Sequence, residues 1–256
     1  MPETPPISIQ LYTLRDEAAG DLAGTIARLG RIGFAGVEPA GFHGVPPREF
    51  KKLVEGAGMR ISSSHIQPPI GDAADEILDA QQEIGAEDVV VAFLPPDRFA
   101  NRDQIFITAD QLNRSLENVK ARGMRLGYHN HNWEFSTRID DQTAHALLFE
   151  QLDPEVFAEI DVYWTQVGGA DPAQVVRDLG DRARLLHMKD GPADDPKKAM
   201  TAAGAGAVDL RGIADAAEHA AWHIVELDRC ETDMFEAVEQ SYRYLVGEGI
   251  SRGRVS

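Results

Sequence analysis

The segment 124–135 holds the densest set of residues that could do chemistry in this chain. Its first half alternates apolar and polar side chains with the period of a β-strand. His129 and His131 follow where such a strand would end, and Glu134 comes within one short turn. Two imidazoles and a carboxylate at a strand end can bind a metal ion or transfer protons. A surface loop could carry the same residues without any ligand. The residues in the rest of the chain are needed to distinguish these two interpretations.

Strand and helix patterns alternate along the whole sequence. Apolar runs and alternating residues predict eight strands, at 7–11, 36–40, 60–65, 88–94, the first half of 124–135, 156–162, 184–189 and 222–228. Each is followed by apolar residues at helical spacing, which predict helices, at 21–32, 47–57, 72–84, 102–122, 141–151, 171–180, 209–220 and 233–247. The longest connection is 190–208.

Eight strand–helix units of about 32 residues each, with no break that suggests a linker, predict an α/β fold with a parallel sheet. They match a single (β/α)8 TIM barrel that covers 1–256. An open doubly wound sheet is the rival architecture. It is disfavoured because no glycine-rich phosphate loop follows the first predicted strand.

Ionisable residues collect at the ends of the predicted strands, where the active sites of such barrels lie. Strand alternation turns Glu159 and Asp161 inward on the sixth strand, and likewise the ionisable residues of the seventh and eighth. Inward charges are costly unless they are paired or bind a metal, so a divalent cation site is expected there. The residues at strand ends are Glu38, His65, His129, His131, Asp161, His187, Lys189, Glu226 and Asp228.

Several of these residues also have purely structural interpretations. Glu38 stands before a proline and could simply hold a loop. His65 follows three serines and could be a hydrogen-bonded core histidine. Lys189 and Asp190 could form a solvated ion pair.

Composition excludes some classes of partner. The 256 residues carry a net charge of −17, which repels nucleic acid and anionic membrane surfaces. A single cysteine, Cys230, allows no intrachain disulfide, as is usual in a reducing compartment. No signal peptide and no membrane-spanning stretch is visible. These features indicate a cytoplasmic protein.

At the strand-end residues the chain resembles the sugar phosphate isomerase/epimerase superfamily with a xylose isomerase-like barrel. Similar members include ketose 3-epimerases, inosose dehydratases, hydroxypyruvate isomerases and enzymes that act on 3-keto-sugars. The resemblance covers nearly the whole chain. The matching pieces are Gly36-Val-Glu38, Ser64-His65, Tyr128-His-Asn-His131 with Glu134-Phe135, Glu159-Ile-Asp161 with Trp164, Leu186-His-Met-Lys-Asp190 and Ile224-Val-Glu-Leu-Asp228.

The resemblance implies one divalent metal ion, among Mn, Mg, Co, Zn and Fe, held by His129, Asp161, His187 and Glu226. His129 stands where many members have a glutamate that is also one of two proton carriers in the epimerases. Trp164 stands where the ketose epimerases have a histidine that grips the substrate. Both differences keep a dehydratase or lyase reaction open.

The implied reaction is proton abstraction next to the carbonyl of a ketose or keto-sugar, giving isomerase or epimerase activity. Glu226 would be both a metal ligand and a base. Residues expected to move protons or hold hydroxyls are His131, Glu134, His65, Lys189 and Glu38, with Trp164 and Gln10 in the substrate pocket. A small-molecule sugar is the expected partner, and a homodimer is one expected assembly.

Two further readings remain open. An AP-endonuclease-like phosphodiesterase on the same barrel would need more metals and a basic surface, against which the net charge argues. A non-catalytic sugar-binding barrel would hold no metal, or would hold one without turnover.

Overall fold

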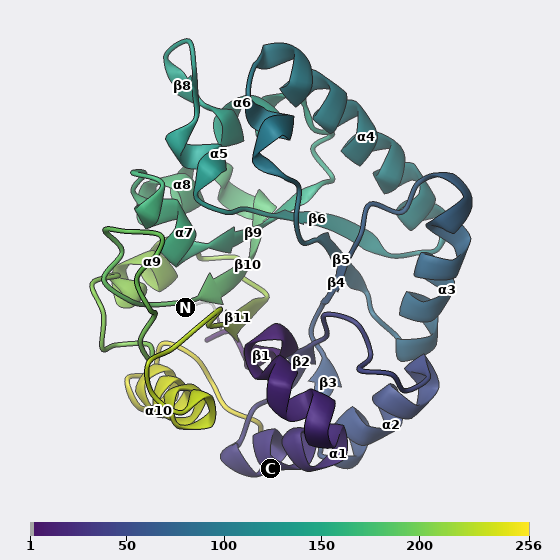
Figure 1. Ribbon diagram of the computed structural model, residues 1–256, viewed down its shortest axis with the longest axis vertical. Helices are drawn as coiled ribbons and strands as arrows, with labels where there is room; N and C mark the ends of the chain where they lie inside the picture. The colour runs from purple at the N-terminus through teal and green to yellow at the C-terminus, as the bar shows by residue number, and fades with distance from the viewer. Residues whose placement is uncertain (1–2, 256) are drawn as a thin grey trace.

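The strands of the computed structural model, which describes residues 3–255, form a parallel sheet wrapped into a barrel with the helices outside it (Figure 1). The sheet has nine strands in the order β3-β2-β1-β11-β10-β9-β6-β5-β4. Their bounds are β1 Ile7–Gln10, β2 Gly36–Glu38, β3 Arg60–Ile61, β4 Ser64–Ile66, β5 Asp88–Val91, β6 Arg125–His129, β9 Phe157–Asp161, β10 Ala183–Met188 and β11 Trp222–Val225. This confirms the predicted TIM barrel.

The barrel closes through the third predicted strand, which is interrupted at Ser62 and Ser63. Its first half, β3, pairs with β2, and its second half, β4, pairs with β5. Across the interruption, the backbone N–H of Ser62 still donates to Val37 O at 3.0 Å. The two serine hydroxyls instead serve buried partners, Ser62 with Ser8 and Ser63 with Glu38. At the break in the strand, Ser63 therefore holds the buried side chain of Glu38.

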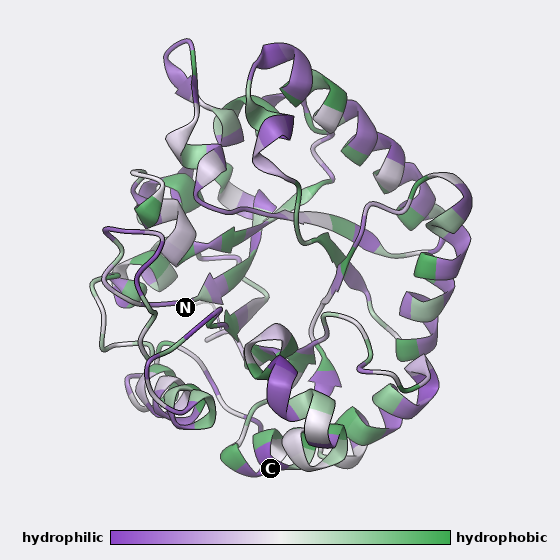
Figure 2. Ribbon diagram, in the orientation of Figure 1, coloured by the Kyte–Doolittle hydropathy of each residue, from purple (hydrophilic) through white to green (hydrophobic). Residues whose placement is uncertain are grey.

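The helices surround the barrel and show alternating hydrophobic and hydrophilic bands, as expected for one buried face (Figure 2). Asp171 and Asp209 cap α8 and α9 by accepting backbone N–H groups. The α-helices are α1 Arg15–Ile32, α2 Pro47–Gly56, α3 Ala74–Ile84, α4 Arg102–Ala121, α5 Trp133–Ser136, α6 Ala144–Gln151, α7 Val162–Val167, α8 Pro172–Leu179, α9 Leu210–Ala216 and α10 Met234–Gly247. Short 3₁₀ helices are η1 Leu11–Leu14, η2 Gly71–Ala73, η3 Pro96–Phe99 and η4 Gly180–Arg182.

Three helices differ from the sequence prediction. The helix predicted at 209–220 ends at Ala216. The first helix begins at Arg15 rather than at residue 21, but it is kinked at Asp21, whose side chain caps Gly24 N at 2.9 Å. The helix predicted at 141–151 begins only at Ala144, because β7 (Arg138–Ile139) and β8 (Gln142–Thr143) pair as a small antiparallel hairpin. No helix among residues 3–255 is long and apolar enough to cross a membrane.

The lower half of the barrel interior is filled by apolar side chains. They form a cluster separate from the larger core between barrel and helices. Gly127 on β6 leaves room for one of them, because a Cβ at this position would lie 2.2 Å from the ring of Phe157. This plug closes the barrel beneath the polar residues, and its buried members are Val90, Phe157, Leu185, Trp222 and Ile224.

The long connection 190–208 is anchored by Asp190, which is 1% exposed. Its carboxylate accepts backbone N–H groups from Gly191 at 2.8 Å, Gly204 at 2.9 Å, Gly206 at 3.0 Å and Val208 at 3.1 Å. Because its neighbour Lys189 is also 1% exposed, the solvated ion pair is excluded. The two side chains serve different parts of the molecule.

Candidate active site

The ends of the parallel strands bring most of the predicted site residues together. The strand register sets Gln10 beside Glu38, His129 beside Glu159 and Asp161 beside His187. The resulting cluster lies directly above the apolar plug, because successive inward positions on each strand change from apolar to ionisable. The predicted residues in it are Glu38, His65, His129, Asp161, His187, Lys189 and Glu226.

Glu159 lies at the centre of this cluster. One oxygen, Oε2, lies 2.6 Å from His65 Nε2, 3.1 Å from His129 Nδ1 and 3.2 Å from His187 Nε2. The other oxygen, Oε1, is buried without a hydrogen-bond partner. Burial opposes ionisation of Glu159, but His187 and His65 outweigh it and hold its pKa well below the ordinary value. Strand alternation predicted that Glu159 points inward, but no role was assigned to it.

His187 bridges two carboxylates. Its Nδ1 lies 2.8 Å from Glu226 Oε2, and its Nε2 lies 2.8 Å from Glu38 Oε1. Glu38 is fixed in turn by Gln10 Nε2 at 2.7 Å and by the hydroxyl of Ser63. Burial disfavours the imidazolium, but the nearby carboxylates, Glu159 first, outweigh it and raise the pKa of His187 well above 6.5. The carboxylates therefore favour the protonated form of His187.

His129 has the opposite character. Burial lowers its pKa to about 4, so its imidazole is neutral at physiological pH. A neutral imidazole is the form that binds metals. His65 differs from it, because Glu38 and Glu159 outweigh burial and raise its pKa. The surroundings thus shift the pKa values of His129 and His65 in opposite directions.

Lys189 supplies the permanent positive charge of the cluster. Its Nζ lies 2.8 Å from Asp161 Oδ2, 2.7 Å from Glu226 Oε2 and 2.9 Å from Asp228 Oδ2. Burial opposes its charge, but these carboxylates outweigh burial and hold the pKa of Lys189 well above 10.5. The ring of Trp164 lies beside it, with its centroid 5.5 Å from Nζ.

Two overlapping sets of side chains fit a divalent cation, and within each set the donor atoms all lie within 4.8 Å of one another. The four buried carboxylates of the cluster also outnumber its one lysine and its two imidazoles of raised pKa, and a cation would neutralise this excess. Mixed imidazole and carboxylate donors suit several divalent metals. One set is His129, Asp161, His187 and Glu226, as the sequence predicted, and the other is His65, His129, Glu159 and His187.

His131 and Glu134 end up on different sides of the same turn. His131 lines the cavity above the cluster and stacks on Trp133, with ring centroids 4.4 Å apart. Glu134 is completely buried, and its carboxylate accepts from Tyr128 OH at 2.6 Å and from His131 N at 3.0 Å. Burial raises its pKa to about 8. Glu134 therefore shapes the turn and is not among the residues that line the cavity.

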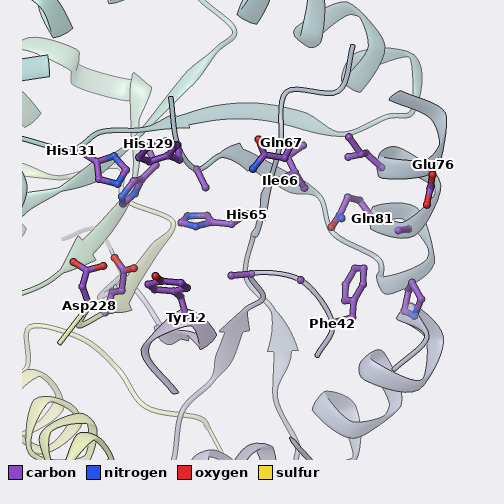
Figure 3. A pocket seen from close by; sticks show the side chains of 18 residues that line it. Tyr12, Phe42, His65, Ile66, Gln67, Glu76, Gln81, His129, His131 and Asp228 are labelled. Atoms are coloured by element: carbon purple, nitrogen blue, oxygen red, sulfur yellow. The ribbon is translucent and has the colours of Figure 1, made fainter. Parts of the chain in front are cut away.

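A cavity of about 920 Å³ opens above the cluster (Figure 3). It reaches the predicted residues His65, His129, His131 and Glu226. The pocket residues predicted from sequence lie elsewhere. Gln10 is buried behind Glu38 and Trp164 is buried beside Lys189, and neither lines the cavity.

Further lining residues were not predicted from the sequence. Tyr12, Phe42 and Phe93 lie in connections after strands, and Gln81 lies on α3. The sequence signal for Tyr12 and Phe42 is that each follows a predicted strand closely, at the end where barrel active sites lie. Phe93 lies near the end of the predicted strand 88–94, which stops at Val91 in the structure.

Comparison with known proteins supports this description of the fold. The family model described as xylose isomerase-like TIM barrel matches residues 26–245. No curated protein matches significantly. Among solved structures, a sugar phosphate isomerase/epimerase from Parabacteroides distasonis is 26% identical, with a TM-score of 0.83 over 98% of this chain and 95% of that one.

More distant structures share the fold. An L-ribulose 3-epimerase is 17% identical, with a TM-score of 0.72 over 96% of this chain and 94% of that one. A probable 3-DHS dehydratase, AsbF, from Bacillus anthracis is 13% identical, with a TM-score of 0.73 over 94% of this chain and 98% of that one. On the evidence of the matched family model and of the barrel itself, the chain belongs to the xylose isomerase-like TIM barrel family.

Proposed function

We propose that this protein is a divalent-metal-dependent isomerase or epimerase that acts on a ketose or keto-sugar. The observation that carries the proposal is the buried set of His129, Asp161, His187 and Glu226, whose donor atoms converge at the floor of a large cavity. The similar sugar phosphate isomerase/epimerase structure supports the same class of reaction. The set of His129, Asp161, His187 and Glu226 would accept Mn, Mg, Co, Zn or Fe, since two imidazoles and two carboxylates discriminate weakly.

The side chains are suited to moving a proton next to a carbonyl. A bound divalent cation would polarise that carbonyl and stabilise the negative charge that develops there. Glu226 lies at the cavity and is held by His187 and Lys189, so it can receive a proton from one face of a substrate. His131 is kept neutral because burial lowers its pKa, and from the turn after β6 it can hold a substrate hydroxyl by a hydrogen bond.

His65 and Lys189 can support the reaction in different ways. His65 borders the cavity, and its raised pKa keeps a proton available for a hydroxyl or a developing oxyanion. Lys189 keeps the carboxylates of Asp161 and Glu226 charged and in position. Glu38 contributes indirectly, by orienting His187.

A dehydratase or lyase is the second candidate. The same deprotonated intermediate loses a β-substituent if a leaving group is present. His129 favours this alternative, because a carboxylate that would carry the second proton in a two-base epimerase is replaced by an imidazole of low pKa. A structural neighbour described as a probable dehydratase has the same barrel.

The test is exchange in heavy water. Metal-loaded protein is incubated with ketoses and 3-keto-sugars, and NMR follows deuterium at the carbon next to the carbonyl. We expect exchange in the wild type and its loss in Glu226→Gln. Rearranged sugars would identify an isomerase or epimerase, whereas unsaturated products would identify a lyase. If no metal binds after loading with Mn or Zn, the proposal fails.

A further inference from the structure

We infer that the substrate of this site carries an apolar, aryl-sized substituent attached to an uncharged keto-sugar ring. The inference rests on the proposed function and adds the class of substrate. It is drawn from the part of the cavity that lies away from the metal-binding cluster.

The cavity has two chemically different parts. The proximal part is polar and is bordered by His65, His129, His131, Glu226 and Asp228. The distal part lies between the β2–α2 connection and α3, and Figure 3 shows Phe42, Gln81 and Glu76 there, on the far side of His65 from the cluster. Its apolar lining consists of Phe42, Pro47, Ile66, Ile77 and Ala80.

The volume exceeds what one sugar ring needs. Sites for drug-sized ligands span roughly 300–1,000 Å³, and this cavity, at about 920 Å³, lies near the upper limit. If a single sugar ring bound at the polar cluster, the distal part of the cavity would still be filled with water in contact with apolar side chains. Covering those walls with an apolar group is favourable, because it removes apolar surface from water.

A second sugar ring fits the distal part poorly. Each hydroxyl buried there would need a hydrogen-bond partner, but the polar side chains lining this part are Gln67, Glu76 and Gln81. Gln81 is 5% exposed, and its carbonyl oxygen is buried without a partner. Its amide end is directed from α3 into the cavity (Figure 3).

A phosphate group fits no better. Among the described residues that line the cavity there is no lysine or arginine. The acidic side chains there, Glu76, Glu226 and Asp228, would repel an anion. Lys189 is already enclosed by three carboxylates. The lining therefore favours a neutral substrate.

The test compares 3-ketoglucose with its phenyl β-glycoside on the metal-loaded protein. We expect the glycoside to have a KM about tenfold lower than that of the free sugar, as the filling of an apolar subsite predicts. Ile77→Asp should remove that advantage and leave kcat and the KM of the free sugar nearly unchanged. Phe42→Ser is a second variant of the same subsite. Ile107→Asp is the matched control, since Ile107 is 54% exposed on α4 and does not line the cavity.

A binding measurement separates this inference from the proposed reaction. Phenyl β-glucoside, which lacks the keto group, is observed by saturation-transfer NMR. Saturation of the phenyl protons in the wild type and in Ile107→Asp, and its loss in Ile77→Asp, supports the subsite even if no exchange reaction is found. Equal KM values for the two substrates, or phenyl signals that do not depend on Ile77, would overturn it.

Discussion

The ammonium group of Lys189 lies 2.8 Å from the carboxylate of Asp161, and both side chains are buried. Asp161 is also a member of a candidate metal-binding set. Asp161 therefore pairs with the positive charge of Lys189 and is also positioned to ligate a metal ion. Breaking a buried ion pair by removing one partner is strongly destabilising, so Lys189 should be essential to the metal-free fold.

Lys189→Gln should destabilise the metal-free protein by about 3–5 kcal/mol, because three carboxylates lose their counterion. Saturating manganese should recover part of this loss, since a bound cation restores positive charge. Chemical denaturation with and without manganese measures both effects. Lys198→Gln is the control, because Lys198 pairs with Asp194 at the surface. Equal stability of Lys189→Gln and wild type would contradict the role given to Lys189.

The double variant Asp161→Ala/His187→Ala should lose bound metal. Elemental analysis of purified wild-type protein should find about one divalent ion per chain, as expected when one buried mixed-donor set is filled. Metal binding should weaken on acidification, because His187 must release its proton to become a ligand.

A surface pair provides the control for this experiment. His219 and Asp181 lie 3.2 Å apart and are exposed. The variant Asp181→Ala/His219→Ala removes the same two residue types and should leave the metal content unchanged. Loss of metal from both double variants would point to non-specific binding.

His145 should make the protein sensitive to acid. It stacks between Phe135 and Phe149, and burial, followed by Arg182, lowers its pKa to about 3. Between about pH 6.5 and 3 the unfolded chain binds a proton that the folded chain does not, so the free energy of unfolding falls as the pH falls through this window.

His145→Phe should remove this contribution, which amounts to as much as about 2 kcal/mol between pH 7 and pH 5. Urea denaturation at the two pH values measures it. His219→Phe, at an exposed site, should keep the wild-type pH dependence. If His145→Phe loses as much stability on acidification as the wild type, the histidine is not the acid-sensitive group.

Gly127→Ala should destabilise the barrel by about 1–3 kcal/mol, because a methyl group would clash with the Phe157 ring in the packed plug. Gly20→Ala is the control, since a Cβ there meets no atom within 4 Å. The double variant Gly127→Ala/Phe157→Leu should recover part of the loss. Thermal denaturation measures all of these variants. No loss in Gly127→Ala would mean that the plug can rearrange freely.

Strand alternation was sufficient to predict the floor of the site. A pleated strand sends successive side chains to opposite faces, so Asp161, His187 and Glu226 could be placed inside the barrel from their neighbours alone. Alternation also turned Glu159 inward. Its central place could not be predicted, because it depends on how β4, β6 and β10 bring three imidazoles to one oxygen.

Spacing along the chain was less informative where the backbone turns. Glu134 lies three residues after His131, yet its carboxylate is captured by Tyr128 and by the His131 backbone N–H. Sequence spacing does not reveal the direction of a side chain in such a turn. The distal part of the cavity was also beyond prediction, because Phe42 and Ile77 meet there only through the packing of α2 and α3 around the barrel.

Asp190 divides the 190–208 connection into two parts, a base that it anchors and an exposed tip. The base is tied to the end of β10 by four backbone contacts. The tip around Asp194, Pro196, Lys197 and Lys198 is exposed. Insertions at the tip should therefore change the outline of the molecule without shifting Lys189, because the anchored base separates the tip from the strand end.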